Sequence, residues 1–302
     1  MQNTDIKNIL KNEFKGKFLE NFPLSEYTSF KCGGNAKYLV YPENIEDVFK
    51  IVKFAKIFNE KILILGKGTN VLISDKGFDG IVISTLKMEK YTIRENTIIC
   101  ECGLLLANLL KICIKNSFSG LEFLAGIPGT VGGGVKCNAG LKKEYLSDRI
   151  LFVEYIDFEK LDVFKKERKE IFFDYRKSEF NENSFIWKTG ITVENDDAKK
   201  IKKKIKEYMN KRIKTQPLGY SAGSIFKNPY PYYAGNLIEK CGLKGYSLGN
   251  CFISPKHANF IINKGKAKAE DIYKLIKLVQ NKVKEKFNIE LELEINLIGE
   301  FE

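Results

Sequence analysis

A glycine-rich segment at residues 126–140 carries the clearest chemical signal in the chain. It reads Gly-Ile-Pro-Gly-Thr-Val-Gly-Gly-Gly-Val-Lys-Cys-Asn-Ala-Gly. Glycine loses backbone entropy in regular structure, so we predict a turn that uses positive φ angles or brings main-chain N–H groups close to a ligand, and no helix or strand interior. Successive N–H groups in such a turn bind phosphate, and Thr130 and Asn138 would add side-chain hydrogen bonds. The alternative is a tight structural loop.

A second loop, Gly66-Lys67-Gly68-Thr69-Asn70, approaches two common phosphate motifs without matching either. A P-loop would need Lys-Ser or Lys-Thr directly after its last glycine, and the chain has no such match. A dinucleotide fingerprint would need Gly or Ala at the position of Val71, where helix and strand pack closely. A doubly wound nucleotide fold is therefore disfavoured. We predict that the two glycine loops form opposite walls of one site.

Length and composition predict a globular protein. A chain of 302 residues with 44% hydrophobic content suffices for about two domains with proper cores. The N-terminal residues are charged and lack the apolar region of a signal peptide, and apolar runs such as Ile62–Leu65 are too short to span a bilayer. We therefore expect a soluble cytoplasmic protein with no membrane partner.

The cysteine content argues against disulfides and against a metal site. Seven cysteines, an odd number, are scattered over the chain, which favours reduced thiols. No Cys-x-x-Cys pair occurs, and His257 is the single histidine, so we predict no metal.

The net charge of +12 leaves three interpretations: nucleic acid, small anionic substrates or a lysine-rich surface. Only five of the fifty basic residues are arginine, whereas base recognition and bidentate phosphate contacts favour arginine. In the densest run, Lys199–Lys204, the neighbouring Ile201, Ile205 and Tyr208 keep helical spacing. A solvated helix face is the better interpretation, and we expect no nucleic-acid partner.

The apolar pattern predicts an α+β protein. A strand, helix, strand unit makes a small α/β domain that delivers the chain to the first glycine loop, and a mostly antiparallel sheet domain follows. A lysine-rich helix then connects to a third unit. Helices are expected at 5–13, from Pro42 onward, and at 104–115, 197–214, 235–241 and 269–287. Strands are expected at 37–41, 61–65, 71–74, 80–84, 91–94, 97–101, 149–157, 170–175, 185–193, 258–263 and 289–298. In the last strand, glutamates alternate with apolar residues, which predicts one acidic face.

Seven segments together resemble the UDP-N-acetylenolpyruvoylglucosamine reductase family, in order from about residue 22 to 300. They are Thr28-Ser29-Phe30 with Gly33-Gly34, the loop 66–70, the segment 126–140, Tyr175-Arg176-Lys177-Ser178, Gly223-Ser224-Ile225-Phe226-Lys227-Asn228-Pro229, His257-Ala258-Asn259-Phe260, and Leu291-Glu292-Leu293-Glu294 with Ile298-Gly299. The chain resembles the shorter form of the family, which lacks a tyrosine-bearing loop over the substrate.

The resemblance implies an FAD enzyme that uses NADPH. It implies a two-part FAD-binding region of the vanillyl-alcohol-oxidase (PCMH) type, at 1–75 and 76–196, a connecting helix at 197–216 and an α/β substrate domain at 217–302. NADPH would reduce the flavin and leave, and the enolpyruvyl UDP-sugar would then accept the hydride, in the second cytoplasmic step of peptidoglycan precursor synthesis. We expect a monomer.

Three catalytic residues follow from the resemblance. Arg176 would bind the substrate carboxylate with its guanidinium fork, and Glu294, if protonated, would help to hold the enolate. Ser224 would deliver a proton to the α-carbon, with help from a neighbour such as Lys227 because a hydroxyl is a weak acid. In isolation each of the three is more often a surface ion pair, a turn residue or a solvated strand residue, and only their occurrence with the glycine loops favours catalysis.

Binding residues follow in the same way. FAD would contact Gly66, Lys67, Gly68, Thr69, Asn70, Gly126, Ile127, Pro128, Gly129, Thr130, Gly132, Gly133, Asn138, Ala139 and Gly140. The UDP-sugar would contact Tyr175, Lys227, Asn228, Lys244 and Asn259, whereas His257 is interpreted as structural.

Three positions depart from the family pattern. Cys137 stands where methionine is usual and Gly134 where alanine is usual, which affects only loop packing. Asn296 replaces a frequent arginine near Glu294, which puts in doubt how the pKa of that carboxyl is set.

Two other hypotheses remain open. A different flavin enzyme of the same superfamily, such as an oxidase, would need a substrate base and oxygen access. A nucleic-acid binding protein would be colourless and would lose DNA affinity steeply with salt, whereas bound flavin would make the protein yellow.

Overall fold

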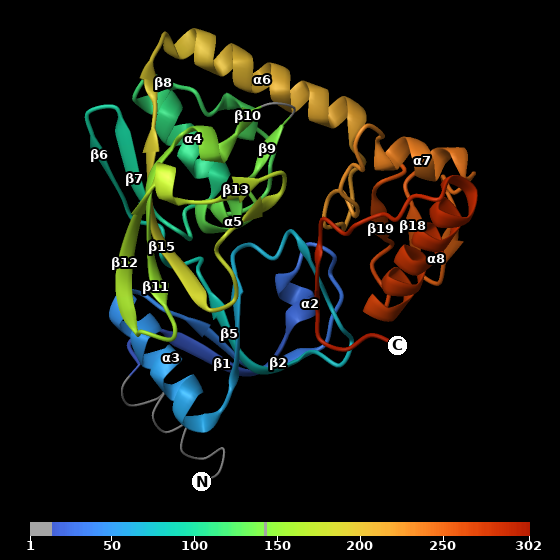
Figure 1. The fold of residues 1–302 in the computed structure, drawn as a ribbon, viewed down its shortest axis with the longest axis horizontal. Coiled ribbons are helices and arrows are strands. Elements are labelled where there is room, and N and C mark those ends of the chain that lie inside the picture. Colours follow the sequence, from blue (N-terminus) through green and yellow to red (C-terminus); the bar gives the residue numbers. More distant parts are fainter. Residues whose placement is uncertain (1–13, 142–143) are drawn as a thin grey trace. The chain divides into compact units, whose positions relative to one another are not determined.

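The computed structural model describes residues 14–141 and 144–302, which form two compact units (Figure 1). The first unit takes its residues from Met1–Glu20, Lys37–Lys67 and Asp79–Lys211, and the second from Asn21–Ala36, Gly68–Phe78 and Arg212–Glu302. Each unit has its own hydrophobic core. The boundaries predicted from the sequence stay a prediction, and the helix predicted at 5–13 lies outside the described residues.

The α/β part of the first unit forms as predicted. Strand β2 (Asn35–Tyr41), helix α3 (Ile45–Phe58) and strand β3 (Lys61–Leu65) follow one another, and the sheet has the order β1-β2-β5-β3, with β1 at Lys17–Pro23 and β5 at Phe78–Ser84. The side chain of Asn44 caps α3 by accepting the N–H of Asp47. Strands β3 and β5 are parallel, so the loop after β3 leaves from a strand's carboxyl end.

The predicted antiparallel sheet is also present in the first unit. Its order is β12 (Asp162–Glu167), β11 (Ile150–Asp157), β15 (Ser184–Thr192), β7 (Thr97–Glu101) and β6 (Tyr91–Arg94), and every neighbouring pair is antiparallel. Helix α5 (Val131–Lys136) packs against β7 and β15. The unit also contains α4 (Leu106–Lys115), β8 (Phe118–Ser119), β9 (Gly140–Leu141), β10 (Glu144–Tyr145), β13 (Phe173–Asp174), β14 (Lys177–Ser178), β16 (Glu194–Asn195) and the 3-10 turns η1 (Glu122–Leu124), η2 (Leu146–Asp148) and η3 (Arg168–Glu170).

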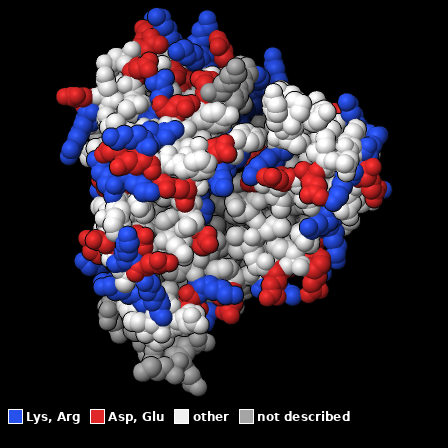
Figure 2. All heavy atoms as spheres, in the orientation of Figure 1, with Lys and Arg blue, Asp and Glu red and all other residues white. Residues whose placement is uncertain are grey.

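Helix α6 (Ala198–Thr215) carries the lysine run on its exposed side. Ile201 is fully buried, and Ile205 and Tyr208 pack against the first core. The predicted solvated helix face is therefore confirmed. In the view of Figure 2, lysine and arginine side chains are interspersed with acidic ones and form no single continuous basic field.

The second unit is built around one long helix. Helix α8 (Ala269–Phe287) buries the stripe that the sequence predicted, formed by Ile272, Leu275, Ile276, Val279 and Val283. A three-stranded sheet of β17 (Ser247–Leu248), β18 (Cys251–Ile253) and β19 (Ile261–Asn263) and helix α7 (Ala234–Lys240) complete this core. Short helix α2 (Leu24–Tyr27) belongs here, as does the parallel pair β4 (Val71–Ile73) and β20 (Asn296–Ile298).

Two predicted strands are largely wrong. Residues 168–170 form a turn in which the carboxylate of Glu170 accepts the N–H of Glu167, so only Phe173–Asp174 of the predicted strand 170–175 forms. In the predicted strand 289–298, only β20 forms, because residues 292–294 hydrogen-bond to residues 225–227 around one isolated bridge, Phe226 to Leu293. The predicted alternation survives in part: Leu291 is buried and Glu292 exposed, whereas Leu293 and Glu294 are both half-buried.

None of the helices in the described ranges combines the length and apolar composition that a membrane span requires.

Candidate functional site

The glycine-rich segment divides into a loop and a helix. Residues 126–130 form a loop in which Gly126 and Gly129 have φ angles of 76° and 148°, as predicted for a glycine turn. Residues 131–136 form helix α5, which the sequence analysis excluded. That exclusion was wrong.

Close packing explains why a helix contains three consecutive glycines. A Cβ atom at Gly132 would lie 2.7 Å from the Cβ of Cys102, and one at Gly134 would lie 3.1 Å from a methyl group of Leu146. Cys102 is buried directly beneath the helix at 1% exposure. The contact with Cys102 and Leu146 therefore outweighs the cost of about 1 kcal/mol for each helical glycine.

Most N–H groups at the start of α5 already have partners. Val131 donates to the carbonyl of Leu104 and Gly132 to that of Cys102, both at 2.8 Å. Gly133 donates to Oγ1 of Thr130 at 3.3 Å, so the Thr130 side chain caps the helix. The predicted phosphate nest cannot use these three donors.

The donors that remain belong to the loop. Within residues 14–141 and 144–302, the N–H groups of Gly126, Gly129 and Thr130 donate to no acceptor. Unpaired main-chain donors beside positive-φ glycines are the chemistry that holds a phosphate. The anion cradle that the sequence predicts at 126–140 would therefore narrow to residues 126–130, which also contain the predicted Ile127 and Pro128.

The other glycine loop meets this cradle in the first unit. A Cβ atom at Gly66 would lie 2.5 Å from Oγ1 of Thr130, so only glycine allows this approach. Lys67 is the next residue and the last of the loop that belongs to the first unit. The two loops are therefore in contact at Gly66 and Thr130, and their lining of one site stays a prediction.

The remaining loop residues belong to the second unit. Gly68 has a φ of 64°, and its carbonyl accepts the N–H of Ser29 at 3.0 Å. The hydroxyl of Ser29 is buried and has no hydrogen-bond partner among the described residues. Asn70 donates from Nδ2 to the carbonyl of Glu294. Thr69 lies between Gly68 and Asn70 in the loop. A buried hydroxyl without a partner beside a glycine loop fits a polar cofactor, so Ser29 is a further candidate for cofactor binding. The sequence analysis did not name it as a site residue, although it lies in one of the seven segments that resemble the family.

Arg176 lies at the tip of a two-residue hairpin. Strands β13 and β14 pair Phe173 with Ser178 and Asp174 with Lys177, which leaves Tyr175 and Arg176 as the turn. Arg176 has a φ of 58°, and its Nη1 donates to the carbonyl of Gly140 at 3.2 Å. Its guanidinium lies 5.4 Å from the centre of the Tyr175 ring. The turn thus presents the predicted arginine and tyrosine together.

Ser224 and Glu294 lie on neighbouring segments of the second unit. The N–H of Glu294 donates to the carbonyl of Ile225 at 2.8 Å, one residue after Ser224. The carbonyl of Glu294 accepts Asn70. Ser224 and Glu294 are both half-buried. The hydroxyl of Ser224 and the carboxyl of Glu294 are therefore carried by two segments whose backbones are hydrogen-bonded to each other.

Four of the predicted UDP residues, all except Tyr175, belong to the second unit and have partners there. Lys227 lies 3.2 Å from the exposed carboxylate of Glu292, and Lys244 lies 2.7 Å from Glu239. Asn228 accepts the N–H of Ala234 at 3.0 Å, which closes the turn before α7.

Asn259 has a structural role. It is 3% exposed, and its amide bonds to both the N–H and the carbonyl of Phe226. It supports the 224–228 segment rather than facing solvent. His257 accepts the N–H of Asn259 and packs edge to face on Phe260, and burial lowers its pKa, so it is neutral at pH 7.

The cysteines are free thiols. Burial raises the pKa values of Cys32 and Cys113 to about 12, so both stay protonated at neutral pH. The described residues contain no group of His, Cys, Asp and Glu side chains suited to a metal ion.

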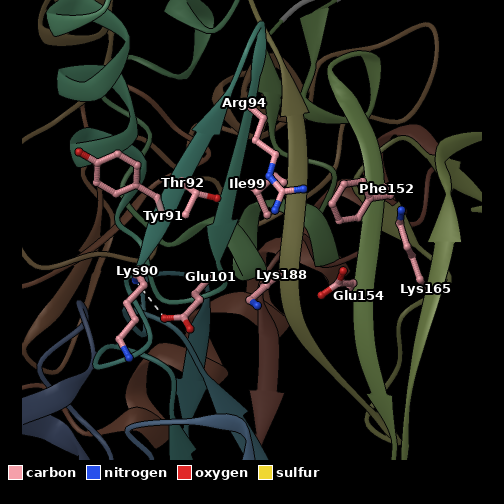
Figure 3. A pocket seen from close by; sticks show the side chains of 10 residues that line it. All are labelled: Lys90, Tyr91, Thr92, Arg94, Ile99, Glu101, Phe152, Glu154, Lys165 and Lys188. Carbon is pink, nitrogen blue, oxygen red and sulfur yellow. Dashed lines mark hydrogen bonds between the residues drawn. The ribbon is translucent and has the colours of Figure 1, made fainter.

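One face of the five-stranded sheet carries a hollow of about 470 Å³ that contains none of the predicted site residues (Figure 3). Strand register places Lys165, Glu154, Lys188 and Glu101 side by side on four strands. The Glu101 carboxylate accepts the N–H of Lys90 at 2.9 Å. The alternating charges offset one another across the four strands.

Two known families match successive parts of the chain. Residues 36–160 match a family described as an FAD binding domain. Residues 198–298 match the C-terminal domain of UDP-N-acetylenolpyruvoylglucosamine reductase.

Curated relatives match over nearly the whole length. The UDP-N-acetylenolpyruvoylglucosamine reductase of Caldicellulosiruptor saccharolyticus is 45% identical and aligns with 95% of this chain and 93% of its own. That of Caldanaerobacter subterraneus is 39% identical and aligns with 98% of this chain and 97% of its own.

Solved structures give the same picture. The UDP-N-acetylenolpyruvylglucosamine reductase from Thermus caldophilus superposes with a TM-score of 0.81 at 31% identity, over 94% of this chain and 99% of that one. An alkyldihydroxyacetonephosphate synthase shares the fold alone, with a TM-score of 0.51 at 18% identity over 65% of this chain and 41% of that one.

Proposed function

The chain belongs to the family of UDP-N-acetylenolpyruvoylglucosamine reductases, and from this we propose that it reduces UDP-N-acetylglucosamine enolpyruvate to UDP-N-acetylmuramate with electrons from NADPH. It is an FAD-dependent oxidoreductase of peptidoglycan synthesis. Its fold is the α+β fold expected, a two-part FAD-binding region of the PCMH type followed by a substrate domain. The observation that carries the proposal is 45% identity along nearly the whole chain.

The FAD-binding residues fit a pyrophosphate-containing cofactor. In the first unit, the unpaired N–H groups of Gly126, Gly129 and Thr130 would bind the pyrophosphate, with Gly66 leaving room for it. In the second unit, Gly68 and the orphaned hydroxyl of Ser29 would contribute. The cofactor supplies hydride transfer when bound, and the protein supplies position and charge.

Arg176 and Glu294 would stabilise the charge that develops on the substrate. Hydride addition to the β-carbon of an enol ether conjugated to a carboxylate spreads negative charge onto that carboxylate. Arg176 would bind it with its guanidinium fork, and Tyr175 would line the same turn. Glu294 in its protonated form would donate a hydrogen bond to the enolate. Asn296 is neutral and takes the position where the family frequently has an arginine. A protonated Glu294 carboxyl therefore does not face that positive charge.

Ser224 would protonate the α-carbon to complete the lactyl ether. The hydroxyl is half-buried on the segment that pairs with Glu294. Lys227 lies three residues on, and its exposed ion pair with Glu292 is weak enough to exchange for a substrate phosphate. Lys244 and Asn228 would bind the diphosphate beside it, and Asn259 would keep the Phe226 backbone in place.

The direct test is to add NADPH and UDP-N-acetylglucosamine enolpyruvate to the purified yellow protein and follow nicotinamide absorbance. NADPH oxidation that depends on the UDP-sugar is expected. If oxidation depends only on oxygen, the flavin enzyme has another substrate and the proposal is wrong.

Replacing Ser224 separates the two half-reactions. Flavin reduction by NADPH needs no proton on carbon, so Ser224→Ala should reduce at the wild-type rate. Reoxidation by the UDP-sugar should slow by about 10²–10⁴-fold, because a positioned proton donor is lost. Stopped-flow flavin absorbance resolves both phases. Equal slowing of both phases would assign Ser224 to the shape of the site instead.

A further inference from the structure

The end of the glycine-rich segment is tied to the Arg176 hairpin at every second residue. The hydroxyl of Ser178 donates to the carbonyl of Lys136 at 2.9 Å. Nδ2 of Asn138 donates to the carbonyl of Asp174 at 3.1 Å. Nη1 of Arg176 donates to the carbonyl of Gly140 at 3.2 Å. Residues 136–140 therefore hold the hairpin along both strands and at its tip.

Asn138 occupies the centre of this contact. Its side chain is only 4% exposed, and its Oδ1 accepts the N–H of Ser147 at 3.1 Å while its Nδ2 holds Asp174. Both ends of the amide are therefore engaged within the first unit. The sequence analysis assigned Asn138 to FAD, but these two bonds leave that amide facing protein backbone.

Only asparagine meets all the demands of this position. The backbone has a φ of 41°, a left-handed conformation that asparagine, aspartate and glycine tolerate best. Aspartate would lack the donor for the Asp174 carbonyl, and glycine would lack both side-chain bonds. A buried carbonyl that loses its donor carries a desolvation cost, so the hairpin strand would shift to find water.

We propose that Asn138 is a positioning residue for Arg176: it fixes the hairpin from which Arg176 reaches the substrate carboxylate. The inference rests on the proposed function of Arg176. Asp174 and Lys177 are the pair that flanks the turn, so a bond to the Asp174 carbonyl sets the angle of the two turn residues. If the hairpin moved the Arg176 guanidinium by about 1 Å, the rate would fall by roughly 10²-fold.

The test uses Asn138→Gly, which keeps the left-handed backbone and removes both amide bonds. Flavin content and the rate of reduction by NADPH should stay at wild-type values. Flavin reoxidation by the enolpyruvyl UDP-sugar should slow by about 10- to 100-fold. Asn138→Asp keeps the acceptor for Ser147 and should show the same split, which covers the case in which the glycine variant does not fold.

A double variant separates positioning from general damage. Arg176→Ala alone should slow reoxidation by about 10²–10³-fold, as for loss of one charge-stabilising donor. Asn138→Gly added to Arg176→Ala should slow it no further, since the arginine that Asn138 positions is gone. The inference would be overturned if the double variant slowed reoxidation by the product of the two single effects. Loss of flavin from Asn138→Gly, or equal slowing of both half-reactions, would also overturn it.

Trypsin provides a readout that needs no activity. Cleavage after Arg176 or Lys177 should be faster in Asn138→Gly than in wild type, because the hairpin opens more often. Asn116→Ala is the matched control: it removes a side-chain amide bond of 2.8 Å to the Ile112 carbonyl elsewhere in this unit and should change neither cleavage nor reoxidation. Unchanged cleavage in Asn138→Gly would contradict the inference. A wild-type enzyme that ignores the UDP-sugar would instead contradict the proposed function, with the cleavage result still standing.

Discussion

The two halves of the glycine-rich segment use glycine for different physical reasons. In residues 126–130, Gly126 and Gly129 adopt positive φ angles and leave N–H groups unpaired. In helix α5, Gly132 and Gly134 have helical backbone, and their missing side chains let the helix approach Cys102 and Leu146. One half leaves main-chain donors unpaired, and the other packs against a core.

This difference shows that glycine content alone does not locate a phosphate site. A donor is useful to a ligand only if the fold has not already paired it. In α5 the carbonyls of Leu104 and Cys102 and the Thr130 cap take the first donors. Substitutions at four positions would test whether the two halves differ in this way.

The largest effect is expected at Gly132. Gly132→Val would drive a branched side chain into the Cβ and carbonyl of Cys102, at 2.7 and 3.2 Å from the new Cβ atom. We expect a loss of about 3 kcal/mol in the free energy of unfolding, the upper range for overpacking a core. Urea denaturation measures it. A folded variant of wild-type stability would remove packing as the reason for this glycine.

The next largest effect is expected at Gly129. Gly129→Val would strain a backbone at φ 148° by about 1–3 kcal/mol and disturb the unpaired N–H groups. The loss should appear as weaker FAD binding, by about 10- to 100-fold, with the fold retained. Flavin fluorescence titration of the apoprotein measures the affinity. Full flavin occupancy in the purified variant would show that 126–130 is no cradle.

Thr130 lies at the junction of the two halves. Thr130→Ala should cost about 1 kcal/mol of stability, because its hydroxyl caps α5 through Gly133. FAD affinity should change little, since the donor expected to face the pyrophosphate is the main-chain N–H. Thr130→Ser is the control and should restore the cap. A large loss of affinity at unchanged stability would mean that the hydroxyl contacts the cofactor.

The smallest effect is expected at Gly133, with the opposite sign. It is exposed, and the nearest atom to an added Cβ is Oγ1 of Thr130 at 3.5 Å. Gly133→Ala should therefore raise stability by about 0.5–1 kcal/mol through helix propensity, with FAD retained. Thermal unfolding and flavin content measure both. Release of FAD would mean that the cofactor approaches the helix and that the halves are less distinct.

Local sequence patterns determined most of the elements. The stripe of α8 and the strand Lys61–Leu65 were predicted residue for residue, because apolar periodicity and flanking turn residues act within a few positions. The acidic alternation was correct from Glu290 to Glu292 but not at Glu294, and most of its strand did not form. Whether such a segment becomes a strand depends on its partner, here the distant residues 225–227.

For the site, the sequence by itself determined the family and its candidate residues, because seven motifs occur in order along one chain. Only the tertiary structure decided how those residues are used. Asn138 and Asn259 look like ligand-binding amides in sequence, yet both are buried and bonded to backbone from other segments. Gly132 looks like part of a phosphate loop, yet it packs against Cys102, thirty residues earlier. Motifs record residue types and spacing, whereas the pairing of each donor and the space around each glycine depend on chain segments that meet only in the folded protein.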